Sequence, residues 1–227
     1  MLDDAVDVSA GQDEAVPRAR LRLMWEFSEL THEEAARLRR RYEPLTASVR
    51  ELIDATVRTE VDDDVAASVK NEIDAAADRL RSLQVEGTLG ISLTPDGNPV
   101  AWGNMANGLR NPLAPPLMIQ RNGDDRARVD VELGAAYEGA PGHLHGGYGA
   151  LVLDHLFGDV ASYGSPDTVA ATGTITYRYE RPTRLGHLRA EAEIQNTEGR
   201  KIFVVGHLAD ADGITVTAEG VFIALRH

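Results

Sequence analysis

The 227-residue chain contains no cysteine, which excludes disulfides, thiol nucleophiles and cysteine-ligated zinc sites and fits a cytoplasmic protein. Aromatic residues make up only 5% of the chain, and no apolar run approaches the length of a membrane span. Basic residues are also scarce, 23 against 36 acidic ones, and the net charge of −13 argues against nucleic acid as a partner. Because 43% of the residues are hydrophobic, we expect one sizeable core.

Two segments precede the part of the chain in which most strands are predicted. Residues 1–20 are acidic and have no periodic apolar pattern, which is typical of a flexible tail. In residues 21–85, apolar residues recur at helical spacing after a capping box that begins at Thr31, and again after three aspartates at residues 62–64 that suit the first turn of a helix. We therefore expect an N-terminal helical extension in the form of a hairpin. Pro44 lies inside its first helix and should kink or split it.

Residues 86–227 alternate apolar and polar positions in several short stretches that end at Gly- and Asp-containing turns, a pattern that indicates antiparallel strands. Among these stretches, a helix beginning at Gly146 is apolar almost all round as far as Val160. Such a helix suits the inside of a curved sheet. The sequence therefore predicts an α+β domain with one long central helix.

This helix contains one carboxylate that its neighbours do not explain. Around Asp154, the positions three and four residues away are Ala150, Leu151, Phe157 and Gly158, none of which can form an ion pair with it. An ionised carboxylate on an apolar surface costs of the order of several kcal/mol unless it is paired or used. One explanation is a buried Asp bonded to a backbone N–H, and the other is a catalytic carboxylate.

The start of the same helix offers donors to a carbonyl oxygen. The N–H groups of Gly146 and Gly147 lack partners within the helix, lie at the positive end of its dipole, and could stabilise a developing oxyanion. Gly147 and Asp154 share a face but lie about 10 Å apart along the axis, too far to act on one carbonyl. Two such helices, antiparallel across a two-fold axis, would bring Gly147 of one beside Asp154 of the other. The spacing thus predicts a dimer with two shared sites.

The stretch from Glu138 to Gly147, followed by Asp154, resembles the HGG-and-Asp signature of hotdog-fold acyl-CoA thioesterases, most closely the PaaI-like and carboxyl-terminal-modulator-like branches. A second stretch, from Thr172 to Pro182, resembles the family strand that carries a site threonine and ends in Tyr-x-Arg-Pro. Together they cover roughly residues 87–225. The resemblance implies a hotdog domain over residues 86–227 that hydrolyses acyl-CoA or acyl-carrier thioesters.

Carried over residue by residue, the resemblance assigns Asp154 as the catalytic carboxylate, Gly147 as the oxyanion donor, His145 as the histidine of the HGG motif and Thr172 as a site hydroxyl. Asp154 could act as general base on water or attack the acyl carbon itself. His145 could contact the substrate or cap the helix. Gly173 stands where the family has an alanine-like residue, a mild departure.

Four further residues are candidates for binding the substrate: Gly146, His143, Arg181 and Arg184. The two arginines belong to a group of basic residues that could bind the phosphates of coenzyme A, although solvated strand-edge charges have the same pattern. His143 has no place in the family pattern. A metal site of His143, His145 and Asp154 would need the aspartate to reach back two helical turns, so no metal is expected. Coenzyme A enters only as part of the substrate, and no cofactor is implied.

Two alternatives share the fold. One is a non-catalytic acyl-CoA-binding or sensing protein, which would favour an apolar residue in place of Asp154. The other is a hotdog dehydratase, which would need a histidine and an acid together at the β-carbon of the acyl chain. The resemblance favours a thioester hydrolase that forms a homodimer or a dimer of dimers. With 21 arginines against 2 lysines, the chain has the bias of a high-GC bacterium.

Overall fold

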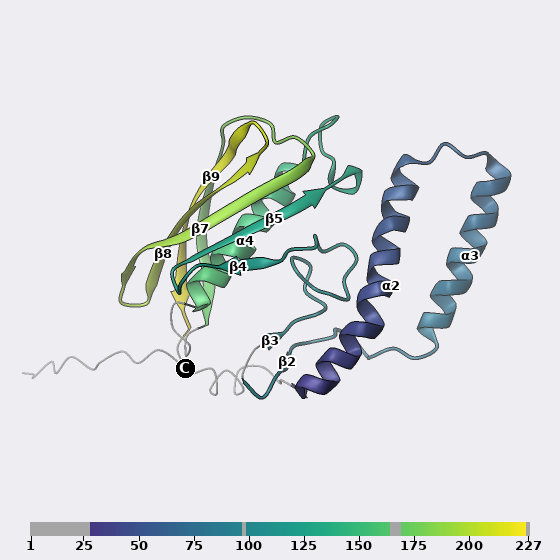
Figure 1. Ribbon diagram of the computed structural model, residues 1–227, viewed down its shortest axis with the longest axis horizontal. Coiled ribbons are helices and arrows are strands. Elements are labelled where there is room, and N and C mark those ends of the chain that lie inside the picture. The colour runs from purple at the N-terminus through teal and green to yellow at the C-terminus, as the bar shows by residue number, and fades with distance from the viewer. Residues whose placement is uncertain (1–27, 97–98, 164–168, 226–227) are drawn as a thin grey trace, which may run out of the picture.

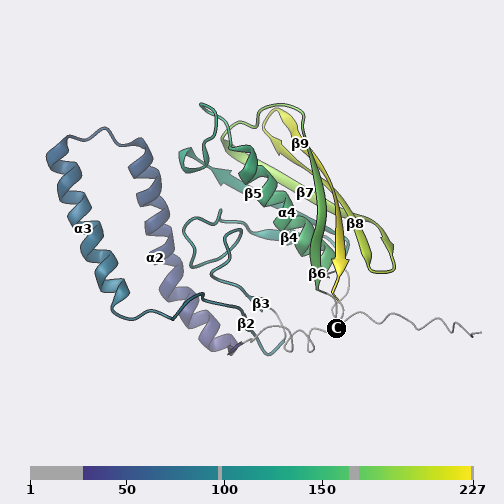
Figure 2. The ribbon, with the colours of Figure 1, turned by 180° about the vertical axis from the view of Figure 1, so that it is seen from behind.

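The computed structural model describes residues 28–96, 99–163 and 169–225, and the predicted tail, residues 1–20, lies outside them. A six-stranded antiparallel sheet curls around one long helix, α4 (Gly146–Tyr163), as Figures 1 and 2 show. The sheet order is β4 (Ile119–Arg121), β5 (Arg126–Leu133), β7 (Gly186–Glu198), β8 (Lys201–Asp210), β9 (Gly213–Ala224) and β6 (Ala170–Tyr179). The predicted α+β hotdog fold is confirmed.

The core lies between α4 and the inner face of this sheet. Alternate residues of β5, β7, β8 and β9 are buried, as the period of two in the sequence requires. From α4, the fully buried Phe157 packs its ring 6.4 Å from that of Phe222 and against Gly206 and Gly220 of two neighbouring strands. Because the sheet wraps α4 on several sides, the helix is apolar almost all round.

The N-terminal helical extension is a pair of helices, α2 (His32–Arg58) and α3 (Asp63–Arg81). The capping box between Thr31 and Glu34 is present as expected. Pro44 does not split α2, which is continuous through it. Pro44 is exposed, so solvent can satisfy the carbonyl that proline leaves unbonded.

One side of α2 holds the extension to the domain, against the short helix η1 (Ala135–Tyr137) and the loop before β4. Arg50 donates to the carbonyl oxygens of Asn111 and Ala114 at 3.3 and 3.2 Å. The boundaries at residues 20 and 85 stay predictions.

A second, small sheet joins the segments before and after the two helices. It joins β1 (Ser28–Glu29), β2 (Ser92–Leu93) and β3 (Pro99–Val100), with β1 parallel to β2. Among the described helices, none is both long and apolar enough to cross a membrane.

The contact of Phe157 with β8 gives a stability prediction. A Cβ at Gly206 would lie 2.3 Å from the Glu191 carbonyl oxygen and 2.5 Å from a Phe157 ring carbon. We expect Gly206→Ala to lower the free energy of unfolding by about 3 kcal/mol, measured by urea denaturation. Gly158→Ala is the matched control, because its Cβ would meet Phe222 at an ordinary 3.6 Å. That variant should be unchanged or more stable by up to about 1 kcal/mol. Equal stabilities would contradict the prediction.

Candidate active site

The loop that leads into α4 is held by hydrogen bonds at both of its ends. The Gly139 N–H donates to the His143 carbonyl and the His145 N–H to the Tyr137 carbonyl, each at 2.9 Å. At the tip, the Gly142 N–H donates to the Glu138 carboxylate at 2.6 Å. Gly142 has a φ of +74°, which favours glycine there. The start of α4 is therefore fixed before any ligand arrives.

Two tyrosines of β6 also hold the first five residues of α4. The Tyr177 hydroxyl donates to the Ala150 carbonyl at 3.2 Å and the Tyr179 hydroxyl to the Gly146 carbonyl at 3.1 Å. Burial raises the pKa of Tyr177 to about 12, so its phenol remains a donor at physiological pH. We did not predict these residues from the sequence. The sequence signal for them was that the two tyrosines are two residues apart, which places both on the same face of the strand.

Asp154 and Thr172, two of the predicted site residues, lie together. The Thr172 hydroxyl donates to a carboxylate oxygen of the half-buried Asp154 at 2.9 Å. Within the part of the chain that the structure describes, no backbone N–H is bonded to this carboxylate. The Thr172 hydroxyl is therefore the hydrogen-bond partner that the structure shows for Asp154.

A β-bulge in β6 aims Thr172 at the helix. The register of β6 against β9 shifts between Thr172 and Thr174. In a regular strand, Thr172 and Tyr177 would point to opposite faces because they are five residues apart. With the bulge between them, both face α4. Gly173 occupies the bulge, where a Cβ would lie 2.9 Å from the Val221 carbonyl oxygen. This close approach is the reason for glycine in place of an alanine-like residue.

His145 caps the helix. The Gly147 N–H donates to Nδ1 of His145 at 3.1 Å, so this nitrogen is an acceptor and the ring proton belongs on Nε2. The predicted oxyanion donor is thus bonded to an imidazole until a ligand replaces it. The structure pairs His145 with Gly147 and Asp154 with Thr172 as two half-sites, and one chain does not bring the halves together, because two helical turns separate them.

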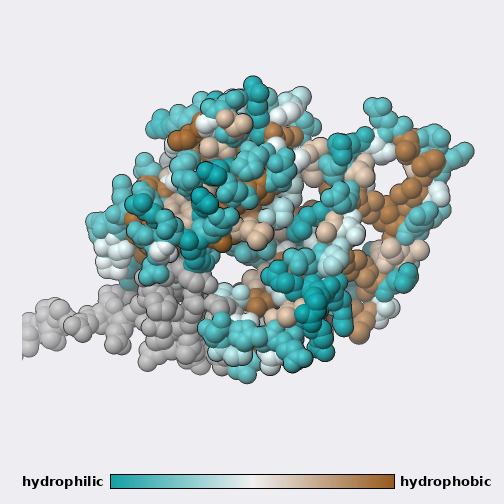
Figure 3. All heavy atoms as spheres, viewed as in Figure 1, coloured by the Kyte–Doolittle hydropathy of each residue, from teal (hydrophilic) through white to brown (hydrophobic). Residues whose placement is uncertain are grey.

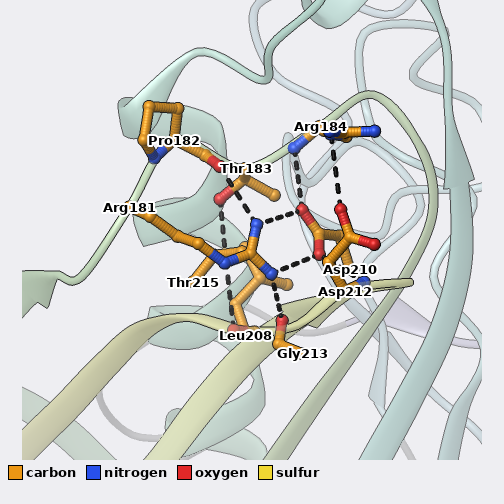
Figure 4. A network of polar contacts seen from close by, with 9 residues as sticks. All are labelled: Arg181, Pro182, Thr183, Arg184, Leu208, Asp210, Asp212, Gly213 and Thr215. Carbon is orange, nitrogen blue, oxygen red and sulfur yellow. Dashed lines mark hydrogen bonds and ion pairs between the residues drawn. The ribbon is translucent and has the colours of Figure 1, made fainter.

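Arg181 is engaged in an ion pair rather than exposed to a ligand (Figure 4). Its guanidinium donates to both carboxylate oxygens of Asp210, at 2.8 and 2.5 Å, and to the Gly213 carbonyl at 2.9 Å. Asp210 also accepts the N–H groups of Arg184 and Asp212. The Arg181 guanidinium and these N–H groups hold the pKa of Asp210 well below its usual range.

Behind this pair, a chain of buried hydroxyls ties the loop after β6 to the last two strands. Thr183 bonds to Thr215 at 2.7 Å, and Thr215 donates to the Leu208 carbonyl at 3.1 Å. The Arg184 side chain is exposed, with its Nε 3.5 Å from Asp212. Substrate binding by Arg181 and Arg184 stays a prediction, and the geometry gives Arg181 a part in holding this loop.

His143 lies in the loop before α4 and is partly buried. Its Nδ1 is 2.8 Å from the Pro141 carbonyl oxygen, and its backbone bridges to Arg184. Among the residues described, no three histidine, aspartate or glutamate side chains gather closely enough to hold a metal ion.

Comparison with known proteins identifies the family. The model of the thioesterase superfamily matches residues 141–217. A solved structure described as a thioesterase superfamily protein is 31% identical, covers 80% of this chain and 90% of its own, and superposes with a TM-score of 0.70. The chain belongs to the thioesterase superfamily.

Two further relatives are less similar. Acyl-coenzyme A thioesterase THEM4 of Bos taurus is 28% identical over 122 residues, which are 52% of this chain and 49% of that protein. The chain thus spans about half the length of this curated relative. A Bacillus halodurans protein solved with CoA is 28% identical over 48% of this chain and 74% of its own, with a TM-score of 0.44.

The segment that matches the thioesterase superfamily contains all eight predicted site residues, from His143 to Arg184. It contains α4, β6, β7 and β8, whereas α2 and α3 lie before it. The two helices are therefore an addition to the matched part of this thioesterase-superfamily chain.

The ion pair between Arg181 and Asp210 predicts a pH-dependent loss of stability. Asp210→Asn should lower the free energy of unfolding by roughly 2 kcal/mol at pH 7, because the part-buried Arg181 and the N–H groups of Arg184 and Asp212 lose a charged acceptor. Since the folded-state pKa is depressed, this stabilisation is complete above the ordinary Asp pKa of about 4 and is lost progressively as the pH falls from there towards the folded-state pKa. Urea denaturation of both proteins between pH 3 and pH 7 measures this difference. Asp212→Asn, which removes an exposed carboxylate, should change little, and a constant Asp210→Asn deficit would refute the assignment.

Proposed function

We propose that the protein hydrolyses acyl-CoA or acyl-carrier thioesters with Asp154 as general base. The observation that carries the proposal is the bond between Asp154 and the Thr172 hydroxyl, which orients one oxygen of a carboxylate on a largely apolar helix. The family and the name of the bovine relative support the reaction class. Composition supports a bacterial source and a cytoplasmic location.

In this reaction, a water molecule attacks the thioester carbon while the free oxygen of Asp154 takes its proton. The C–S bond then breaks, and the acid and the thiol are released. A thiol has an ordinary pKa near ~8.5, so the thiolate leaves without strong acid assistance. No metal or redox cofactor takes part.

The Gly147 N–H stabilises the oxyanion, and His145 is the group that the substrate displaces. A neutral thioester carbonyl gains little by replacing an imidazole acceptor. The developing oxyanion forms a stronger, charge-assisted bond and is favoured by the helix dipole. The exchange therefore stabilises the transition state more than the bound substrate, which is what raises a rate.

A second copy of the chain completes the site. Strand β6 pairs with β9 on one side and lies at the edge of the sheet, so alternate residues along its ten-residue length present unpaired backbone groups. Such an edge favours pairing with another strand. Because β6 carries Thr172, pairing across a two-fold axis there would bring Gly147 of the partner subunit towards Asp154.

Loss of the carboxylate tests the reaction. We expect Asp154→Asn to lower kcat by about 100-fold or more while the protein stays folded. The measurement is free-thiol release from short, long and aromatic acyl-CoAs, and a thiol reagent reads only the product because the chain has no cysteine.

Asp159→Asn is the control, since Asp159 lies on the same helix and pairs with Arg121. It should retain turnover. Tight acyl-CoA binding by the wild-type protein without thiol release would support the sensing alternative instead.

Subunit mixing tests the shared site. Gly147→Pro removes the N–H in the first helical turn, where proline is tolerated, and Asp154→Asn removes the base. Each variant alone should be inactive. Refolded together in equal amounts, they should regain about a quarter of wild-type activity, because half of the dimers are mixed and each has one intact site of two. No recovery in mixtures that contain mixed dimers would show that the site lies within one chain.

A further inference from the structure

Helix α3 has an apolar stripe that the rest of the chain does not bury. None of its side chains is buried. The stripe consists of Val65, Val69, Ile73 and Leu80, which are 44, 39, 38 and 53% exposed. Figure 3 shows the hydrophobic residues of this extension gathered along the space between α2 and α3. A helix with one apolar face needs a partner to bury it.

Helix α2 cannot supply the whole of that partner. Its domain side is occupied, with Thr46 buried and Arg50 bonded to two carbonyls of the loop before β4. On α2 and in the connection to α3, Leu45, Val57 and Val61 also remain more than a third exposed. The hairpin therefore projects from the domain, as Figures 1 and 2 show, and its apolar residues stay exposed.

The charges of α3 are arranged to fit a second copy of the same helix. Its first turn follows Asp62 with Asp63 and Asp64, and its last turn carries Arg79 and Arg81. If two α3 helices lie antiparallel across a two-fold axis, the acidic start of each lies beside the basic end of the other. The positive end of each helix dipole then also lies beside the negative end of the other, which is favourable.

The apolar stripe has the same symmetry. With the axis near Ile73, Val65 of one helix lies opposite Leu80 of the other, and Asp64 lies at the same level along the axis as Arg81. Arg81 now pairs with Asp78 in an exposed, weak ion pair that can be exchanged. An isologous contact requires a surface that complements itself, and α3 meets this requirement along its apolar stripe, with acidic and basic ends placed level with each other.

We propose that α3 packs antiparallel against α3 of a second copy, so that two hairpins form a four-helix bundle. Figure 2 shows the hairpin on the opposite side of the domain from β6. The bundle is therefore separate from pairing at the β6 edge and does not depend on the proposed reaction. A chain that uses both contacts assembles as a dimer of dimers.

Substitution at the axis tests the bundle in the full-length protein. Ile73→Glu should halve the molar mass measured by light scattering, because it places two like charges at the contact. Asn71→Glu, which adds the same charge to the polar face of α3, should leave the mass unchanged. Circular dichroism checks that both variants keep their helices. A wild-type mass equal to that of Ile73→Glu overturns the proposal.

Charge exchange tests the antiparallel orientation. Asp64→Arg and Arg81→Asp should each raise the dissociation constant of the contact by about fivefold or more, and the double variant should restore it. Single and double variants with equal association would contradict the antiparallel arrangement.

A cross-link tests the occupant. Because the chain has no cysteine, Ile73→Cys introduces a single thiol, and a short bis-maleimide should join two chains through it. Asn71→Cys should not cross-link. Absence of the Ile73 product overturns pairing with a second copy and leaves another protein as the occupant.

Thiol release per chain should be the same in Ile73→Glu and wild type. The test of the bundle is therefore independent of the test of Asp154.

Discussion

The distance between α4 and the sheet is set by the ring of Phe157, which packs against Gly206 and Gly220 where any side chain would intrude. This distance lets three hydroxyls of β6 reach the helix: that of Thr172 bonds to Asp154 at 2.9 Å, and those of two tyrosines bond to the carbonyls of Gly146 and Ala150. A helix held farther out would lose all three bonds together. The arrangement of the candidate site thus depends on a packing contact that contains no polar atom.

Much of this arrangement can be read from the sequence because its signals are local and strong. The apolar run from Gly146, the glycines before it and the unexplained Asp154 all lie within one helix and its leading loop. The period of two along the later strands predicts their buried faces. Hydrophobic periodicity and capping residues also predict the two N-terminal helices, since both features depend on neighbours three or four residues away.

Other parts depend on contacts between distant residues. The bulge at Gly173 reverses which residues of β6 face the helix, and only the approach of Val221 reveals it. Arg181 and Asp210 lie 29 residues apart, so the sequence does not distinguish a buried ion pair from a free cation. Pro44 was expected to kink or split α2, but an exposed proline does not divide a helix whose other side is packed. The role of His145 depends on the direction in which its ring points.

The bond between His145 and the Gly147 N–H has a consequence for water. A donor at a helix start that lacked a protein partner would hold an ordered solvent molecule, and a substrate would have to remove it. Here an imidazole fixed to the same backbone fills that position, and it can rotate away and return without leaving the protein. In the proposed reaction, the exchange on binding and release would therefore be intramolecular.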